Sequence, residues 1–189
     1  MARGPQIQTQ RLTLRRWQEE DLKPFAALNA DPVVMEHFPS VMTEEDTARM
    51  ITRIEEHFDE NGYGLWAVER ELSGDFVGFT GLFVPSFEAH FTPAVEVGWR
   101  LAAEHWGKGY ATEAARGALR FGFEQAGLDE VVSFTVPANI PSTKVMERIG
   151  MTHDAADDFN HPSLPESSPL QRHILYRMSA SDWDDLNQS

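Results

Sequence analysis

The chain has 189 residues, of which 41% are hydrophobic and 24% charged, and this length and composition fit one domain with a sizeable core. No apolar run approaches the roughly 20 residues that span a bilayer, the N-terminus lacks the apolar segment of a signal peptide, and there is no cysteine, so we expect a cytoplasmic protein without a membrane partner or disulfides. The formal net charge of −14 argues against a general nucleic-acid binder and is compatible with an amine-bearing partner, although acidity also simply keeps a protein soluble.

The first two predicted elements are a strand and a helix. Residues 11–16 alternate between polar and apolar side chains, which is typical of a half-buried strand. Apolar residues recur at near-helical spacing over residues 19–29, where Pro24 is tolerable only in the first turn of a helix. Asp31-Pro32 then ends this helix.

A second helix is predicted over residues 44–60. Thr43 and Asp46 have the spacing of a capping box, with Asp in the position that Glu usually takes. Hydrophobic residues follow at helical spacing, and Asn61-Gly62 ends the helix.

Three strands follow this helix. Residues 65–71 and 76–83 are aromatic and β-branched runs joined by a short turn, a pattern that predicts a β-hairpin. Residues 94–101 alternate as a third strand, which places Glu96 and Arg100 together on one face.

The stretch EHWGKGYATEAA, residues 104–115, is an anion-binding pattern. Gly107 and Gly109 precede a helix predicted over residues 110–126. The first turn of a helix has unpaired N–H donors and the positive end of the helix dipole, and glycine lets a phosphate come close to them. A glycine-rich turn without any ligand is the alternative.

Two familiar phosphate motifs do not match this stretch. A Walker loop needs Ser or Thr directly after Gly-Lys, but Gly109 follows Lys108. A dinucleotide fingerprint needs a third Gly or Ala where Thr112 stands. The positive charge of Lys108 is nevertheless suited to an anion.

Strands and a helix are predicted for the remainder. Residues 131–136 form a continuous apolar run that suits a buried strand. A break at 137–142 precedes a helix that Gly150 caps, and strands at 151–155 and 173–178 flank a polar, Pro-rich loop.

Six blocks of this sequence carry a family resemblance: TQRLTLRRW (9–17), GLWAVER with its Gly-Asp turn (64–75), VGFTGL (77–82), VEVGWRL (95–101), WGKGYATEAA (106–115) and PANIPSTKVMERIGM (137–151). In this order and spacing they resemble the GNAT superfamily of acetyl-CoA-dependent N-acetyltransferases, and within it the RimJ/RimL-type branch, which acetylates protein N-termini and small amines. The resemblance implies a single α/β (α+β) domain over residues 1–189. Its mixed, mostly antiparallel twisted sheet would have about six to seven strands, flanked by about four helices and splayed at the CoA-binding strand.

The resemblance implies acetyl-CoA (coenzyme A) as cosubstrate, and no metal. The family motif is Gln or Arg, two residues, Gly, one residue, then Gly or Ala; Gly109 and Ala111 fill the last two places, while Trp106 replaces Gln or Arg. Backbone N–H groups of residues 107–112 would hold the CoA pyrophosphate, and the strand end at 99–101 would pair with the pantetheine arm. The implied cofactor-binding residues are Trp99, Arg100, Leu101, Trp106, Gly107, Lys108, Gly109, Tyr110, Ala111, Thr112, Asn139 and Ser142.

Acyl transfer to an amine needs a group that removes a proton from the ammonium and a donor for the leaving thiolate. Glu96 is the candidate base, because partial burial in an apolar strand would raise its pKa; an ion pair with Arg100 is the alternative. Ser142 is the candidate thiolate donor, and its alternative is an ordinary helix cap. Many relatives use a tyrosine seven residues beyond Asn139 as the acid, but Met146 stands there.

The implied activity is acetylation of a primary amine, on a protein N-terminus or a small molecule, by direct attack in a ternary complex. The alternative is a catalytically silent acyl-CoA-binding GNAT-like sensor or interaction domain. A homodimer is expected by family analogy only. Glu113 in the first turn of a helix favours a structural role, and His153, His161 and His173 fit no metal-binding spacing, so we interpret them as packing or solvated residues.

Overall fold

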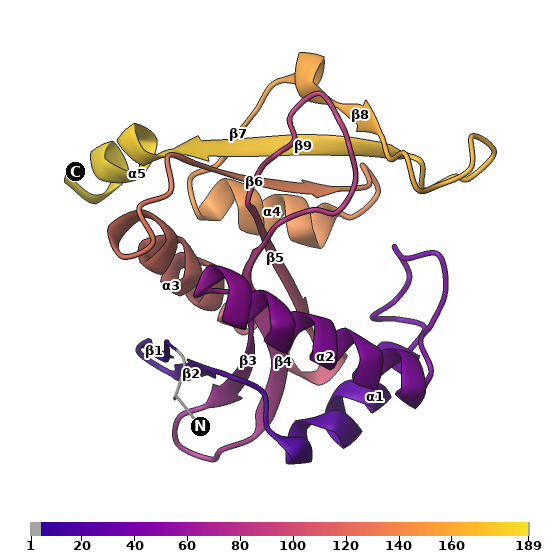
Figure 1. The fold of residues 1–189 in the computed structure, drawn as a ribbon, viewed down its shortest axis with the longest axis vertical. Helices are drawn as coiled ribbons and strands as arrows, with labels where there is room; N and C mark the ends of the chain where they lie inside the picture. The colour runs from indigo at the N-terminus through magenta and orange to yellow at the C-terminus, as the bar shows by residue number, and fades with distance from the viewer. Residues whose placement is uncertain (1–4, 189) are drawn as a thin grey trace.

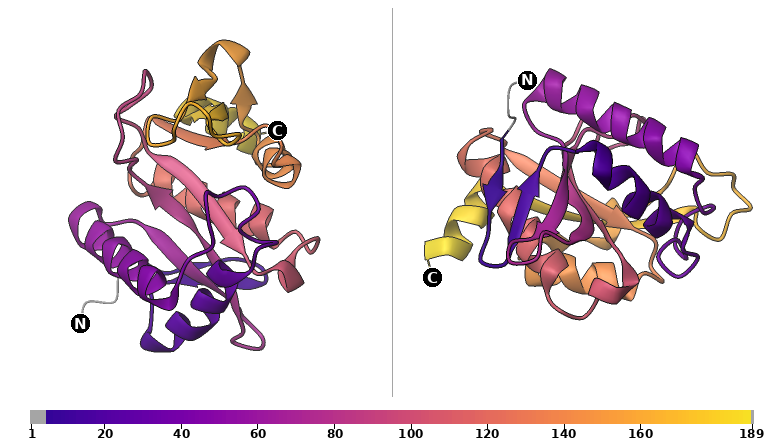
Figure 2. Two further views of the ribbon diagram at one scale, coloured as in Figure 1. Left: turned by 90° about the vertical axis from the view of Figure 1, so that its right-hand side faces the viewer. Right: turned by 90° about the horizontal axis from the view of Figure 1, so that it is seen from below.

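The computed structural model describes residues 5–188, which form one sheet with helices on both faces (Figures 1 and 2). The strands are β1 (Ile7–Gln8), β2 (Leu12–Arg15), β3 (Leu65–Arg70), β4 (Phe76–Phe83), β5 (Glu96–Leu101), β6 (Glu130–Thr135), β7 (Thr152–His153), β8 (Phe159–Asn160) and β9 (Arg172–Ser179). The helices are α1 (Leu22–Ala30), α2 (Glu44–Asn61), α3 (Tyr110–Glu124), α4 (Ile140–Arg148) and α5 (Ala180–Gln188). Short 3₁₀ turns lie at Glu19–Asp21, Ala103–His105 and Ala155–Asp157.

The sheet has the strand order β1-β2-β3-β4-β5-β6-β9-β7, with β8 paired to β9. Neighbouring strands are antiparallel except β5 and β6, which are parallel and in register at one position, Glu96 with Val132. Figure 1 shows β5 running steeply to β6. The expected mixed, mostly antiparallel sheet that splays at this strand is therefore confirmed.

Helix α3 lies close to the sheet because small side chains face it. The helix packs on β4 and β5, and Ala114, Ala115 and Ala118 are completely buried. A Cβ atom at Gly122 would lie only 3.0 Å from Leu82 of β4, so a larger residue there would push the helix outward. This close packing sets the position of the helix N-terminus, at which the anion-binding pattern lies.

Helix α2 confirms the sequence prediction most closely. The Thr43 side chain accepts from the Asp46 N–H, and the Asp46 carboxylate accepts from the Thr43 N–H, so both bonds of the capping box are present. The helix ends at Gly62, whose φ of 77° is left-handed.

Several expected boundaries were wrong, and the described residues contain more strands than the six or seven expected. The additional strands β1 and β8 each have two residues, too few to show a period of two in the sequence. The strand expected at 151–155 is limited to Thr152–His153, because the 3₁₀ turn Ala155–Asp157 follows it. Strand β5 begins at Glu96 rather than at residue 94. Helix α4 begins at Ile140, inside the predicted break, with Asn139 as its N-cap.

Candidate active site

The glycine-rich stretch forms a loop that ends at the N-terminus of α3. Gly107 and Gly109 have φ values of 72° and 79°, in the left-handed region that favours glycine. A Cβ atom placed on Gly107 would have no neighbour within 4 Å, so space is open in front of the loop. The first N–H groups of α3, starting at Tyr110, have no intrahelical acceptor. The loop is thus an open cradle of backbone donors, as an anion requires.

Trp106 anchors this loop to the sheet. Its indole Nε1 donates a hydrogen bond of 2.8 Å to the carbonyl oxygen of Leu101, the last residue of β5. The ring remains 45% exposed. Trp106, which replaces the Gln or Arg of the family motif, therefore holds the glycine loop to the end of β5. The sequence pattern did not indicate this structural role.

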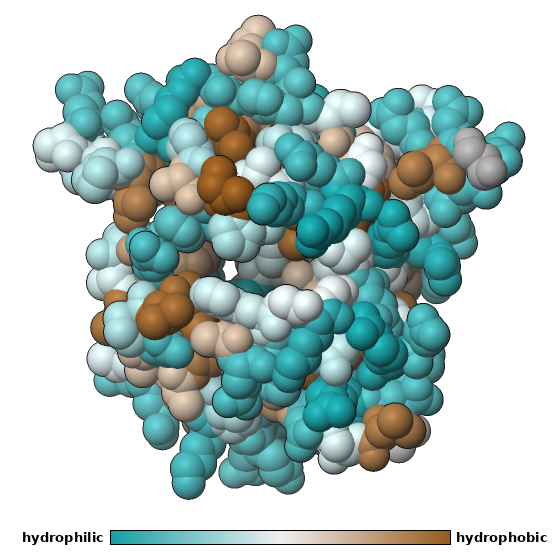
Figure 3. All heavy atoms as spheres, turned by 180° about the vertical axis from the view of Figure 1, so that it is seen from behind, coloured by the Kyte–Doolittle hydropathy of each residue, from teal (hydrophilic) through white to brown (hydrophobic). Residues whose placement is uncertain are grey.

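A cavity of about 1150 Å³ connects this loop to the opening between β5 and β6. It is lined by all of the predicted cofactor-binding residues except Lys108, and also by Glu96. The backbone carbonyl of Lys108 accepts a hydrogen bond from Arg11 at 3.0 Å. Seen from behind, the molecule is hollowed near its centre (Figure 3). Glu96, the glycine loop and Ser142, which lie up to about 50 positions apart in the sequence, therefore line one cavity.

Strand β5 offers free backbone groups to this cavity. The Val95 carbonyl accepts from the Val132 N–H at 2.8 Å, and the Val97 carbonyl accepts from the Ser133 hydroxyl at 2.9 Å. Alternate residues of a strand direct their backbone groups to the same side, so those of Trp99 also face β6. No β6 residue is in register with Trp99, so an extended ligand has a strand edge available to it.

Glu96 lines the cavity next to this edge. Part of its side chain is open to the cavity, but the carboxyl lies deep among protein atoms, and burial raises its pKa to about 8. Within residues 5–188 its carboxylate makes no hydrogen bond or ion pair. The ion pair with Arg100, left open by the sequence, is therefore not formed.

Arg100 is instead engaged with the helical side of the sheet. Its Nη1 donates to Asn29 Oδ1 of α1 at 2.7 Å, and its guanidinium lies 4.1 Å from the centre of the Phe38 ring. Burial lowers the pKa of Arg100 to about 10, and its Nε is buried without a hydrogen-bond partner in the described part of the chain. These contacts join β5 to the segment between α1 and α2, and they leave Glu96 without a counter-charge.

Asn139 and Ser142 lie where α4 begins beside the cavity. Asn139 Oδ1 accepts from the Ser142 N–H at 3.3 Å, and Asn139 Nδ2 donates to Thr135 Oγ1 of β6 at 3.0 Å. Asn139 is therefore the N-cap, and the alternative that Ser142 caps the helix is wrong. The Ser142 hydroxyl has no hydrogen-bond partner among the described residues, although its residue lines the cavity.

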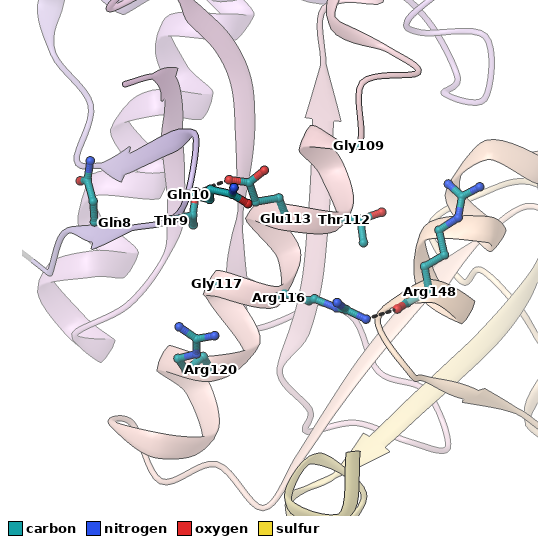
Figure 4. Close-up of a pocket in the computed structure, with 10 residues that line it drawn as sticks. All are labelled: Gln8, Thr9, Gln10, Gly109, Thr112, Glu113, Arg116, Gly117, Arg120 and Arg148. Carbon is teal, nitrogen blue, oxygen red and sulfur yellow. Dashed lines mark hydrogen bonds between the residues drawn. The ribbon is translucent and has the colours of Figure 1, made fainter. Parts of the chain in front are cut away.

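A second, smaller cavity of about 550 Å³ adjoins the first and shares Gly109, Thr112 and Arg148 with it (Figure 4). Its basic side is formed by Arg116, Arg120 and Arg148, none of which forms an ion pair within residues 5–188. Arg116 donates to the carbonyl oxygen of Arg148 at 2.7 Å. In a chain of net charge −14, this cluster is a local site of positive charge beside the glycine loop.

Glu113 holds the N-terminal segment against α3 in this region. Its carboxylate accepts from Thr9 Oγ1 at 2.7 Å and from Arg11 Nε at 2.6 Å. Burial acts to raise the pKa of Glu113, but these hydrogen bonds outweigh it and the pKa is lowered. The arrangement fits the structural role predicted for this residue.

The far side of the cavity is formed by segments that motif analysis did not single out. Residues 33–39 between α1 and α2 form one side, and the loop from His161 to His173 forms another. The His161 ring centre lies 4.4 Å from that of Phe87, and burial lowers the pKa of both histidines, so they are packing residues as interpreted. Only the tertiary fold brings these segments together.

The described residues offer neither a metal site nor a membrane span. No group of three or more His, Cys, Asp or Glu side chains is placed to hold a metal ion. None of the helices combines the length and apolar character that crossing a membrane requires.

The fold and the cavity together define an acyltransferase architecture, with a parallel strand pair that opens beside a glycine loop and a helix N-terminus. A family model described as an acetyltransferase (GNAT) domain matches residues 11–152. The chain therefore belongs to the GNAT family of acetyltransferases, whose members use acetyl-CoA as the acetyl donor.

Similarities to individual proteins are consistent with membership of the GNAT family. The uncharacterised protein YkkB of Bacillus subtilis is 33% identical over 146 residues, which cover 76% of this chain and 83% of that protein. The FsC-acetyl coenzyme A-N(2)-transacetylase of Aspergillus fumigatus is 32% identical over 186 residues, covering 95% of this chain and 78% of that protein. The crystal structure of a GNAT-family acetyltransferase from Bacillus anthracis matches with a TM-score of 0.77 at 25% identity, covering 94% and 99% of the two chains.

Proposed function

We propose that this chain, acting as one domain of the RimJ/RimL-type branch, transfers the acetyl group of acetyl-CoA to a primary amine in a ternary complex. The observation that carries the proposal is that one cavity contains the donor cradle, the free edge of β5, an unpaired buried carboxylate and a free hydroxyl. The name of the Aspergillus relative, an N(2)-transacetylase, supports a nitrogen atom as the acceptor.

The residues present fit acetyl-CoA. A pyrophosphate suits the open cradle from Gly107 to the first turn of α3, because backbone donors and the helix dipole favour an anion there. The extended pantetheine arm, with its amides, suits the strand edge at Trp99. The arginines of the adjoining cavity add positive charge at the outer end of the same path.

Glu96 acts as the general base in this proposal. A primary amine is mostly protonated near neutral pH and reacts only after it loses a proton, so a carboxylate near the reacting nitrogen must accept that proton, directly or through one water. A pKa of about 8 makes the Glu96 carboxylate a stronger base than an ordinary glutamate, while a useful fraction remains ionised at pH 8.

Ser142 is proposed as the donor to the leaving sulfur. Bound acetyl-CoA supplies a thioester carbonyl carbon, which the amine nitrogen attacks as the C–S bond breaks. Because Asn139 satisfies the helix cap, the Ser142 hydroxyl is free to donate a hydrogen bond to the sulfur as negative charge develops on it.

The experiment is a measurement of free thiol released from acetyl-CoA with a panel of primary amines, together with CoA affinity by calorimetry. We expect amine-dependent release above the hydrolysis blank. Tight CoA binding without release on any acceptor would contradict the proposal and favour the silent acyl-CoA-binding domain.

A further inference from the structure

Several large apolar residues line the cavity away from the glycine loop. We define the apolar wall as Val34, Phe38, Phe83, Phe134, Leu164 and Leu170, all of which line the cavity. They come from the segment between α1 and α2, from β4, from β6 and from the loop before β9. The wall is therefore built by four segments that share the cavity with the candidate base.

Carboxylates are scarce in this cavity although the chain is acidic. The chain has 30 Asp and Glu residues, and two of them, Glu36 and Glu96, line the cavity. The Glu36 side chain is 72% exposed, so water and salt screen its charge. Glu96 alone lies close enough to the β5 edge to interact with the reacting nitrogen.

Two acidic residues that precede the loop of the wall, Asp157 and Asp158, are already paired. Asp157 accepts from Arg177 Nε at 2.6 Å, and Asp158 is hydrogen bonded to His153 at 2.8 Å. Neither lines the cavity. These two carboxylates are therefore not presented to the apolar wall.

The histidine, lysine and arginine residues that line the cavity add no negative charge; they are His37, Arg100, His105, Lys144, Arg148, His161 and His173. Burial lowers the pKa of His161 and of His173, so both rings are neutral near pH 8, and they pack with the aromatic side chains. Arg100 is positively charged and stacks on Phe38 of the wall. A second ammonium group on the acceptor would lose hydration against the wall and gain no counter-charge.

We propose that the acceptor is a primary monoamine with an apolar alkyl or aromatic body, whose nitrogen reaches Glu96 while its body lies on the apolar wall. This proposal rests on the acetyl-transfer function above and names its substrate class. A polyamine is excluded from the same position because its second charge would face the wall.

The first test compares two acceptors of equal chain length, hexylamine and 1,6-diaminohexane, by thiol release at pH 8. We expect kcat/KM for hexylamine to be at least about tenfold higher, although the diamine has two reactive ends. Equal or greater kcat/KM for the diamine, or for spermidine, would overturn the proposal.

The second test changes the wall. Leu170→Asp places a carboxylate in a half-buried loop position of the wall, and Leu170→Asn is the matched control of nearly equal shape without charge. The Asp variant should narrow the preference for hexylamine over the diamine by roughly tenfold, because the new charge balances the second ammonium, and the Asn variant should not. Identical ratios in both variants would contradict the position assigned to the acceptor body.

Measuring amine binding tests the apolar acceptor independently of acetyl transfer. If no amine releases thiol although CoA binds, the proposed function fails, and amine binding to the CoA-loaded protein still tests the wall. Tighter binding of hexylamine than of the diamine by calorimetry supports the apolar acceptor, and the reverse order refutes it.

Discussion

The Glu96 carboxylate is buried without a positively charged neighbour, an environment that disfavours its ionised form. Its neighbours leave it without a counter-charge because Arg100 is bound to Asn29 and Phe38. The group therefore has a high pKa caused by burial, which is the property that a general base acting on an ammonium needs.

The first prediction concerns activity. Glu96→Gln should lower kcat by roughly 100-fold or more, because the carboxylate that accepts the proton is lost. In the native protein kcat/KM should rise with pH and level off above about pH 8, where Glu96 is ionised. In the variant it should keep rising above pH 8, since only free amine then reacts. An unchanged pH profile by thiol release would remove Glu96 from the mechanism, and unchanged CoA affinity is the control.

The second prediction concerns stability at the same residue. The folded-state pKa of about 8 lies above the ordinary value of 4.5, so the folded chain binds a proton that the unfolded chain has released. The free energy of unfolding should therefore fall as pH rises from about 4.5 to 8. Glu96→Gln should raise it by roughly 1 to 3 kcal/mol at pH 8 and by little at pH 4.5. Denaturant titration of both proteins at the two pH values checks this, and an equal change at both would be inconsistent with it.

The sequence alone does not decide the role of the Ser142 side chain. A serine near the start of a helix has two ordinary interpretations, a cap or a free hydroxyl, and the sequence left both open. The choice depends on Asn139, which accepts from the Ser142 N–H and so takes the cap. The roles of both residues toward CoA stay predictions.

At the scale of elements, the glycine loop depends on α3 and on β5. Helix α3 places its donors at the cavity, and Trp106 fastens the loop to the end of β5. The left-handed backbone at Gly109 directs these donors toward the open space.

The third prediction tests this loop. Gly109→Trp should weaken CoA binding by roughly 100-fold or more, because a large side chain would occupy the cradle. Gly62→Trp is the matched control, since Gly62 has nearly the same φ, 77° against 79°, at a helix end that does not line the cavity. The melting temperature should decrease by a similar amount in both variants. Calorimetry that finds CoA affinity retained in Gly109→Trp would show that the site is misplaced.

At the scale of the whole molecule, one cavity contains both the proposed acetyl-CoA site and the proposed acceptor site. Its volume of about 1150 Å³ exceeds the usual range of roughly 300 to 1000 Å³ for a single small ligand. Residues from the segment after α1 and from strands β3, β4, β5, β6 and β9 line it, so the site forms only when these distant segments are assembled.

The fourth prediction follows from this shared cavity. Initial rates measured over a matrix of acetyl-CoA and amine concentrations should give intersecting double-reciprocal lines, because both substrates must be present for direct attack. The absence of cysteine from the sequence removes the most nucleophilic side chain as a carrier of the acetyl group. Parallel lines would indicate an acetylated enzyme and contradict the ternary complex.

The sequence by itself determined the elements with strong local signals and the location of the anion loop. Helix α2 and its cap, the hairpin of β3 and β4, and the glycines before α3 follow from periodicity, capping and backbone freedom, which act over a few residues. The two-residue strands β1 and β8 were missed, because pairing with another strand and not a local pattern creates them. The exact start of α4 was missed as well, because the Asn139 cap sets it.

Only the tertiary structure decided the chemistry around Glu96. The partner of Arg100 lies 71 positions away at Asn29, and the apolar wall comes from four separate segments. The pKa of a carboxyl and the charge of a cavity are set by everything packed within a few ångströms, which no local pattern in the chain records. The sequence indicated an acetyl-CoA site, and the fold defined the environment that the acceptor amine must enter.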